Sequence, residues 1–364
     1  MKILHMITGL GGGGAERQLS YLAPALSRRG HDVHVAFAFA GVHSERLAGS
    51  PCTLHHLSAS SRFALIRLAQ TIPLVRRLRP DVLHTWLTHM DIVGYSAVRL
   101  LRVPWLMSER SAALSYPPTL LNRLRVAAGK RADVIVSNSE GGAEYWRTQS
   151  VEADRIEIVP NFVPLADIEA AGPLHDERVS ADDELVIHIG RLSPEKNLSA
   201  LVSALPHVFR ARPRAKFAFC GEGLLLGDLT AQVAAAGLRE RVVFAGFVPN
   251  VASWLKRASA AVAVSRCEGH PNAVLEAMAA GVPVVVSDIP AYRSILGDES
   301  AAFAGGDNIE GIADAIINTL EDRAAAELRA ARARLSLASQ SIDATAARYE
   351  HAYRRAIEIA VARH

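Results

Sequence analysis

The chain has 364 residues, of which half are apolar and 21% are charged, and its formal net charge is +3. These values suit a globular protein with room for two domains, and no apolar run is long enough to span a bilayer. The three cysteines are odd in number and far apart, which argues against a disulfide framework or a zinc site and favours a reducing cytoplasm.

The net charge is unevenly distributed along the chain. Residues 1–165 contain 19 Lys and Arg against 12 Asp and Glu, whereas residues 166–364 contain 21 against 25. The first part is therefore basic and the second part slightly acidic. We expect the first part to be the one that faces an anionic surface.

Short apolar runs alternate with helical patterns along the whole chain. This alternation predicts parallel sheets with helices on both faces, and two such series predict two doubly wound α/β domains. The first series has strands at 2–8, 32–38, 52–57, 81–86, 103–108, 133–137 and 156–160. The second has strands at 185–190, 215–220, 241–245, 260–265, 282–287 and 301–304. Helical stretches between them include Glu16–Arg29, Leu65–Leu78, Leu198–Ala211, Leu224–Ala236 and Val251–Ala258.

We expect an N-terminal domain over 1–165, a second domain over 166–340 and a closing helix over 341–364. The join lies in a stretch rich in Pro, Asp and Glu between Pro160 and about Asp183. The closing helix has Tyr349 and Tyr353 at helical spacing. Spacing alone allows this helix to pack on its own domain or on the first one.

A glycine-rich turn from Gly9 to Glu16 follows the first strand and opens a helix. Such a turn can bind a nicotinamide dinucleotide. That site would also have an acidic ribose contact at the end of the second strand, and Val35–Ala40 ends without one. The sequence therefore disfavours a dehydrogenase.

Two cations follow the first strand of the second series. The strand ends at Gly190, and a turn brings Arg191 and then Lys196 to the start of the next helix. Fixed cations at the mouth of an α/β crevice can stabilise the charge that grows on a departing diphosphate. The alternative is a pair of solvated surface cations.

Two glutamates, Glu268 and Glu276, stand on either side of a helix start. Pro271 suits the first helical position, and the helix N-terminus would then offer amides to a diphosphate. Glu276, further into the helix, would reach a pair of ribose hydroxyls. The alternative is a solvated acidic loop followed by a core helix.

The segments Gly190–Asn197 and Glu268–Glu276 resemble the two signatures of the retaining glycosyltransferases of the group 1 or family-four class. The resemblance implies the GT-B fold, in which two Rossmann-like domains face each other and the final helix crosses back to the first domain. It implies catalytic roles for Arg191, Lys196 and Glu268, and no metal ligand or other cofactor. It places the donor on Glu276, Gly269, Asn272, Ala273, Val274, Gly14, Gly221 and Val248.

The same resemblance places acceptor-side residues in the first domain, at Gly13, Glu16, His89, Glu109 and Arg110. Family members often have a histidine after the fifth strand, and this chain has none over residues 107–111. A histidine-assisted role is therefore in doubt. Glu109 and Arg110 would bind sugar instead, or form a buried ion pair.

A basic amphipathic stretch from Leu120 to Arg131, with Arg76, Arg77 and Arg79 nearby in sequence, suits contact with anionic lipid head groups. A solvated helix face fits the same pattern equally well. Nucleic acid is not expected, because the basic residues are not interleaved with aromatic ones.

The resemblance implies a metal-independent, retaining transfer from a nucleotide sugar, with UDP-sugars favoured, to a saccharide or lipid-linked acceptor. The expected setting is bacterial polysaccharide, lipopolysaccharide or glycolipid synthesis in the cytoplasm, peripheral to the inner membrane. Two rivals remain: another GT-B enzyme, such as a nucleotide-sugar epimerase or a phosphorylase, and a non-catalytic protein that binds nucleotide sugars.

Overall fold

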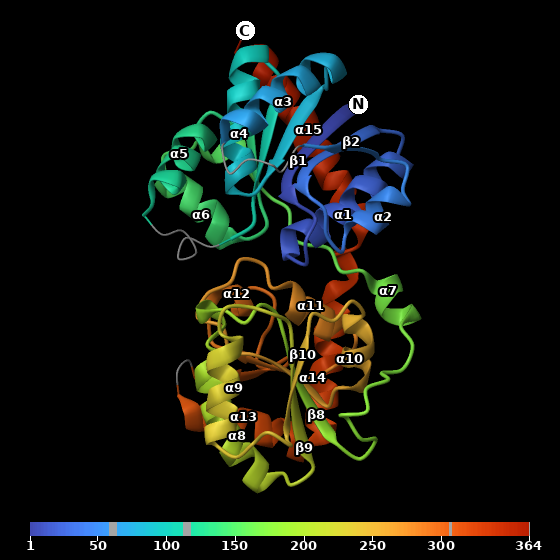
Figure 1. Ribbon diagram of the computed structural model, residues 1–364, viewed down its shortest axis with the longest axis vertical. Helices are drawn as coiled ribbons and strands as arrows, with labels where there is room; N and C mark the ends of the chain where they lie inside the picture. The colour runs from blue at the N-terminus through green and yellow to red at the C-terminus, as the bar shows by residue number, and fades with distance from the viewer. Residues whose placement is uncertain (58–63, 112–117, 306–307, 364) are drawn as a thin grey trace. The chain divides into compact units, whose positions relative to one another are not determined.

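The computed structural model describes residues 1–57, 64–111, 118–305 and 308–363. The chain divides into two compact units: unit 1 comprises Met1–Phe162 and Ile342–His364, and unit 2 comprises Val163–Ser341. Each unit is a parallel sheet with helices on both faces (Figure 1). This confirms the predicted pair of doubly wound domains.

The sheet of unit 1 has seven strands in the order β3-β2-β1-β4-β5-β6-β7. The order reverses between β1 and β4, and ligands of such sheets bind outside the carboxyl ends of the strands at this point. The strands are β1 (Lys2–Gly9), β2 (Asp32–Phe39), β3 (Thr53–His56), β4 (Val82–Trp86), β5 (Trp105–Glu109), β6 (Val134–Ser137) and β7 (Ile156–Ile158).

Alternate residues of β1 enter different cores. Ile3 and Ile7 pack on the side of α1 and α15, whereas Leu4 and Met6 pack on the side of α3 and α4. Both faces are buried, which explains why apolar residues occupy both sides of the strand. The helices of unit 1 are α1 (Gly14–Arg28), α2 (Ser44–Ala48), α3 (Ala64–Leu78), α4 (Thr88–Leu101), α5 (Leu120–Gly129), α6 (Glu140–Thr148), η2 (Ala153–Arg155) and α15 (Ile342–Ala362).

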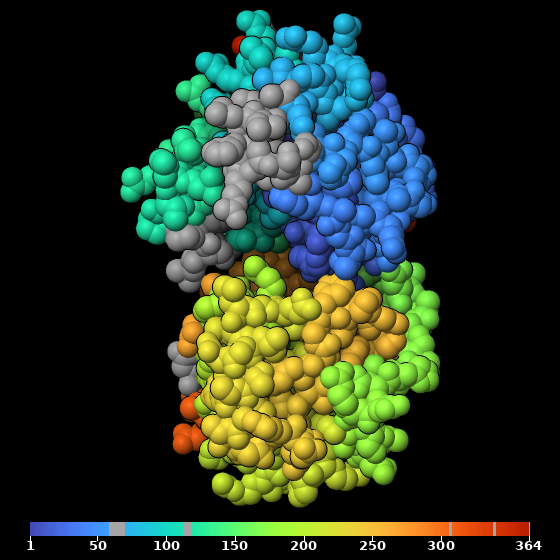
Figure 2. Space-filling view, in the orientation of Figure 1, coloured from blue at the N-terminus to red at the C-terminus, as the bar shows by residue number. Residues whose placement is uncertain are grey.

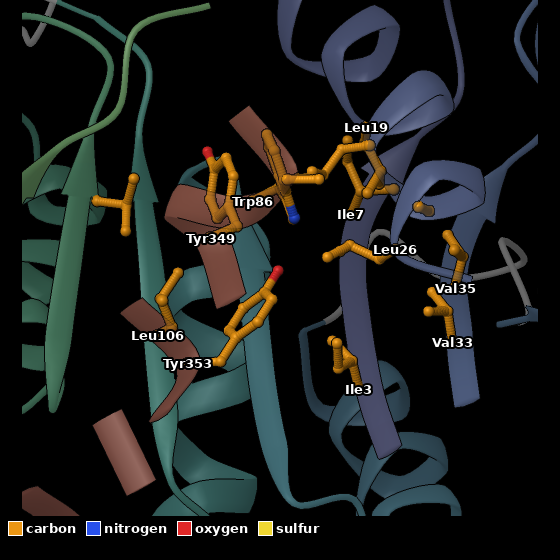
Figure 3. Close-up of a cluster of buried hydrophobic side chains, with 14 of the residues drawn as sticks. Ile3, Ile7, Leu19, Leu26, Val33, Val35, Trp86, Leu106, Tyr349 and Tyr353 are labelled. Atoms are coloured by element: carbon orange, nitrogen blue, oxygen red, sulfur yellow. The ribbon is translucent and has the colours of Figure 1, made fainter. Parts of the chain in front are cut away.

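Helix α15 completes the core of unit 1, although it is the last element of the chain. Tyr349 and Tyr353 are almost fully buried, and Figure 3 shows their rings beside Trp86, Leu106 and Ile3. The crossing-back of the final helix that the GT-B resemblance implies is therefore confirmed.

The sheet of unit 2 has six strands in the order β10-β9-β8-β11-β12-β13, so it repeats the first topology with its reversal between β8 and β11. Val186 packs on the side of α8 and α13, and Leu185 and Ile187 pack on the side of α10 and α11. The strands are β8 (Glu184–Ile189), β9 (Ala215–Cys220), β10 (Val242–Gly246), β11 (Ala260–Ala263), β12 (Val284–Ser287) and β13 (Ala302–Ala304).

The helices of unit 2 cover both faces of its sheet. On the face of unit 2 seen in Figure 2, the yellow segments around α8 and α9, the golden segment around α10 and the green segment after α7 form most of the surface. The helices are α7 (Leu165–Ala170), η3 (Pro194–Lys196), α8 (Leu198–Ala211), α9 (Leu226–Ala235), α10 (Val251–Arg257), α11 (Asn272–Ala279), α12 (Pro290–Arg293), α13 (Ile309–Glu321), α14 (Arg323–Leu335) and η4 (Ser336–Ser339). Within the described residues, no helix has both the length and the apolar character that crossing a bilayer requires.

Candidate functional site

Glycines bring three loops together at the carboxyl edge of the unit 2 sheet. The Gly190 amide donates to the Cys220 carbonyl at 3.0 Å, and Gly221 forms an isolated bridge with Gly246. A Cβ atom on Gly221 would overlap the Gly190 carbonyl oxygen, and its φ is +154°. Only glycine therefore fits where the loops after β8, β9 and β10 meet.

Lys196 and Glu268 form an ion pair at this edge. Lys196 ends η3, Glu268 lies in the loop after β11, and Lys196 Nζ donates to Glu268 Oε1 at 2.6 Å. The two side chains are 17% and 15% exposed, so water screens the pair less than an open surface pair. The structure thus brings together two of the three predicted catalytic residues.

Two further side chains contact Glu268. Ser265 Oγ donates to Glu268 Oε1 at 2.8 Å, and the Tyr292 hydroxyl lies 3.3 Å from the same oxygen. The sequence analysis missed both residues. Ser265 could have been found from its position three residues before Glu268 at the end of a strand, but nothing in the sequence links Tyr292, on α12, to this loop.

Arg191, the third predicted catalytic residue, lies at the same edge but points into solvent. Its side chain is 77% exposed and lies 3.4 Å from Glu195 Oε1. Glu195 also accepts a hydrogen bond from Ser193 Oγ at 2.7 Å. An exposed ion pair of this kind contributes little free energy, so the guanidinium can leave Glu195 and turn toward an incoming anion at small energetic cost.

Helix α11 starts one residue later than the sequence predicts. Pro271 is the N-cap residue, not the first helical residue, because its ψ of 91° lies outside the helical region. Its carbonyl accepts hydrogen bonds from the amides of Val274 and Leu275, both at 3.1 Å. The Val274 amide, a predicted phosphate contact, is thus engaged within the first turn.

The other predicted donor contacts of unit 2 lie around this helix start. Gly269, Asn272 and Ala273 are half-buried in the loop and first turn. Glu276 lies one turn further along α11 and is only 4% exposed. Val248 follows β10, and its side chain packs against the apolar cluster beneath α10 and α11.

His188, on β8, is a buried neighbour of Lys196 that the sequence analysis did not single out. Its Nδ1 lies 3.1 Å from the Val262 carbonyl, an acceptor, so this nitrogen has the proton. Burial, and then the Lys196 cation, lower the pKa of His188 to about 4. The imidazole is therefore neutral near pH 7.

In unit 1, four of the predicted residues lie after β1 and β4, at the carboxyl edge of the sheet. Gly13 is the N-cap of α1, Gly14 is its first residue, and Glu16 in the first turn folds its carboxylate back beside Gly13. His89 is exposed in the first turn of α4. Leu87, just before that helix, has a φ of +70°, which is strained for a residue with a branched side chain.

Arg110 follows β5 and is held by two other segments of unit 1. It donates to the Tyr349 hydroxyl at 3.1 Å and to Asn161 Oδ1 at 2.6 Å. Its guanidinium also lies 5.0 Å from the centre of the Trp86 ring. These contacts fix the side chain at the end of the strand where the sequence lacks the family histidine.

Glu109 lies in a buried ion pair, but its partner is Arg125, whereas Arg110, the partner that the sequence analysis suggested, contacts Tyr349 and Asn161. Glu109 Oε2 accepts from Arg125 and from Trp146 Nε1, both at 2.9 Å, and Arg125 also donates to Asp91 at 2.7 Å. Burial raises the pKa of Asp91 to about 6. Arg125 belongs to the stretch predicted to face lipid, but it is 2% exposed, so that interpretation is wrong for this one residue.

The outward face of α5 is apolar and basic. Leu120, Leu121 and Leu124 are 72%, 38% and 48% exposed, and Arg123 and Lys130 are exposed beside them. Residues 118–131 contain no Asp or Glu.

Among the described residues of the chain, no group of three His, Cys, Asp or Glu side chains could hold a metal ion.

Two family models match the chain, one in each part. "Glycosyltransferase Family 4" matches residues 12–167, and "Glycosyl transferases group 1" matches residues 175–336. The second match contains the Lys196–Glu268 pair and α11.

Several curated proteins are similar over much of the chain. N-acetylgalactosamine-N,N'-diacetylbacillosaminyl-diphospho-undecaprenol 4-alpha-N-acetylgalactosaminyltransferase of Campylobacter jejuni is 26% identical over 88% of this chain and 90% of that protein. UDP-Gal:alpha-D-GlcNAc-diphosphoundecaprenol alpha-1,3-galactosyltransferase of Escherichia coli is 25% identical over 69% of each chain.

Solved structures share the fold at lower identity. HepE of Anabaena, solved with UDP and glucose, has a TM-score of 0.84 and 19% identity over 96% of this chain and 98% of its own. Sucrose-phosphate synthase of Thermosynechococcus elongatus has a TM-score of 0.80 and 19% identity over 98% and 99%.

Proposed function

The chain belongs to the group 1 glycosyltransferases of the GT-B class, and on that premise we propose that it transfers a sugar from a UDP-sugar to a saccharide or lipid-linked acceptor. The names of the Campylobacter and Escherichia relatives specify acceptors linked to diphospho-undecaprenol. HepE was solved with UDP and glucose. These relatives support a role in bacterial polysaccharide or glycolipid synthesis.

The Lys196–Glu268 pair is the observation that carries the proposal. It lies at the carboxyl edge of the unit 2 sheet, where α/β sheets bind ligands, and its glutamate is in the loop that leads into α11. As the bond between the sugar and the diphosphate breaks, negative charge grows on the phosphate oxygens. Lys196, Arg191 and the N-terminus of α11 would stabilise that charge.

Unit 2 would hold the donor. Gly269, Asn272 and Ala273 bring backbone close to the phosphates, with Gly221 and Val248 lining the same edge. Glu276 would accept hydrogen bonds from the ribose hydroxyls, and Glu268 from the donor sugar. Because an ammonium and a guanidinium supply the counter-charge, the proposed reaction needs no metal ion.

Unit 1 would hold the acceptor. Gly13, Glu16 and His89 lie at the carboxyl edge of its sheet, and Arg110 follows β5 at the same edge. Gly14, the first residue of α1, would instead approach the donor. Glu109 would act indirectly, because its Oε1 accepts from the Ser111 amide at 2.9 Å and so orders the start of the loop after β5.

The proposed reaction retains the anomeric configuration, as is typical of the family. The acceptor hydroxyl would attack from the face that the diphosphate leaves, and a phosphate oxygen would take its proton. An α-linked donor would then give an α-linked product.

The outward face of α5 would rest on the anionic cytoplasmic surface of the inner membrane. Exposed leucines beside cations are typical of helices that lie in a bilayer interface. Cosedimentation with vesicles of phosphatidylglycerol but not phosphatidylcholine is expected, and changing Leu120, Leu121 and Leu124 to serine should abolish it. The matched control changes Leu328 and Leu335, exposed leucines of α14, to serine.

The test of the main proposal is a transfer assay. Purified protein is incubated with UDP- and GDP-sugars and with lipid-linked or simple saccharide acceptors, and nucleotide release and product mass are measured. The expected result is acceptor-dependent release of UDP and a product heavier by one sugar. Isomerisation of the nucleotide sugar would favour the epimerase, and binding without turnover would favour the non-catalytic alternative.

A further inference from the structure

Three side chains contact the Glu268 carboxylate, and all of them contact the same oxygen. Within the described part of the chain, Lys196, Ser265 and Tyr292 all contact Oε1, at 2.6, 2.8 and 3.3 Å, and Oε2 has no hydrogen-bond partner. A carboxylate oxygen in a partly buried site accepts hydrogen bonds readily. Oε2 is therefore the oxygen that remains for a ligand.

The three donors come from separate parts of unit 2. Lys196 comes from η3, Ser265 follows β11, and Tyr292 lies on α12 between β12 and β13. Tyr292 is fully buried in the apolar cluster beneath α10 and α11, so its ring cannot follow Glu268 if that loop moves. Burial, and then the Glu268 charge, raise the pKa of Tyr292, and its hydroxyl keeps its proton.

Hydrogen bonds order these donors into a chain. Ser265 Oγ donates to Glu268 Oε1, so its lone pairs are available to the Tyr292 hydroxyl, which lies 3.2 Å away. The Ser265 carbonyl accepts from Ser287 Oγ at 2.5 Å, which fixes the backbone from which the chain starts. Lys196 has three N–H donors and keeps two for a phosphate after pairing with Glu268.

We propose that Tyr292, whose single O–H is shared between Ser265 Oγ and Glu268 Oε1, is a positioning residue that fixes the Glu268 carboxylate with Oε2 directed to a hydroxyl group of the donor sugar. The inference rests on the proposed function. It predicts that the tyrosine affects recognition of the sugar and leaves recognition of the nucleotide unchanged, because its hydroxyl contacts only the glutamate side of the Lys196–Glu268 pair.

The experiment compares the affinities of the wild-type chain and Tyr292→Phe for UDP and for the UDP-sugar selected in the transfer assay, by titration calorimetry. The variant should bind UDP as the wild type does and bind the UDP-sugar about tenfold more weakly, as the loss of one hydrogen bond to a charged group implies. In steady-state kinetics, KM for the donor should rise more than kcat falls.

Two further variants control for structural damage. Tyr353→Phe is the matched control, because it removes the hydroxyl of another fully buried tyrosine, in unit 1, and should leave both affinities unchanged. Ser265→Ala removes the intermediate of the hydrogen-bond chain and should act in the same direction as Tyr292→Phe. It keeps the inference testable if the tyrosine variant does not fold.

Different outcomes distinguish the inference from the proposed function. A wild-type chain that binds neither UDP nor any UDP-sugar overturns the proposed function and this inference with it. A wild type that binds both, with Tyr292→Phe and Ser265→Ala unchanged, overturns the inference alone. Equal weakening of UDP and UDP-sugar also overturns it, because the residues would then support the unit as a whole.

Discussion

The two sheets have the same strand order around their reversal point, yet their first strands have different surroundings. Each strand has a buried histidine: His5 on β1 and His188 on β8. His5 accepts from Trp86 Nε1 at 3.2 Å and packs between aromatic rings, whereas His188 lies beside Lys196. The comparison shows that the strand order provides the crevice in both units. The side chains around the first strand then determine whether its buried histidine packs against aromatic rings, as in unit 1, or lies beside a cation, as in unit 2.

The largest expected effect tests the charged edge of unit 2. Lys196→Ala should lower kcat by about two orders of magnitude or more, because a fixed cation that stabilises transition-state charge is lost. Initial-rate measurements of UDP release would show this. Lys216→Ala is the control, since Lys216 is near the opposite end of the sheet, at the start of β9. Near-normal turnover of the Lys196 variant would contradict its assignment.

A smaller effect is expected at Glu276. Glu276→Gln keeps the volume of this buried side chain and removes its charge, so donor binding should weaken about tenfold while kcat changes less. The dissociation constant for the UDP-sugar is the quantity to measure. Glu310→Gln, an exposed change on α13, should be neutral. An unchanged donor affinity would mean that the ribose contact lies elsewhere.

Acidification should lower the free energy of unfolding of unit 1 through His5, which is buried among aromatic rings. Burial lowers the pKa of His5 to about 3, so between about pH 6.5 and pH 3 the unfolded chain binds a proton that the folded chain excludes. Stability therefore falls as the pH falls. His5→Gln should lessen this fall by up to about 1.4 kcal/mol per pH unit.

Denaturant unfolding at several pH values would measure this difference. Fluorescence reports mainly on unit 1, which holds the buried Trp86, Trp105 and Trp146. Exposed His56, changed to glutamine, is the control. Asp91 has the opposite effect, because its raised pKa increases stability as the pH falls below about 6. The wild type, His5→Gln and the His56 variant all contain Asp91, so its contribution cancels when their pH profiles are compared. Parallel pH profiles for wild type and His5→Gln would refute the assignment.

The smallest expected effect is that of chelation. EDTA should leave the transfer rate unchanged, because Lys196 and Arg191 supply the counter-charge in the proposed reaction. The control is addition of magnesium or manganese after chelation. Loss of activity that either metal restores would show that the cations of unit 2 are insufficient.

Much of this arrangement could be predicted from the sequence. The alternation of apolar runs and helical patterns predicted both sheets. Gly190, Lys196 and Glu268 could be placed at one edge, because they lie in segments that follow the carboxyl ends of two strands. The individual side-chain partners that depend on how helices pack could not be predicted. Tyr292 contacts Glu268 because of the way α12 packs. The sequence around Arg125 predicts an exposed cation, whereas the structure pairs Arg125 with Asp91 and Glu109.

The return of α15 to unit 1 also has a consequence for synthesis. Residues 1–162 of unit 1 emerge from the ribosome first, but Tyr349 and Tyr353, which fill its core, are made only after all of unit 2. Until α15 has been made, Trp86 and its neighbours are not buried by that helix, whereas all the strands of unit 2 are already present. The nascent chain therefore finishes its second unit before its first, and the open core of unit 1 is where a chaperone would bind.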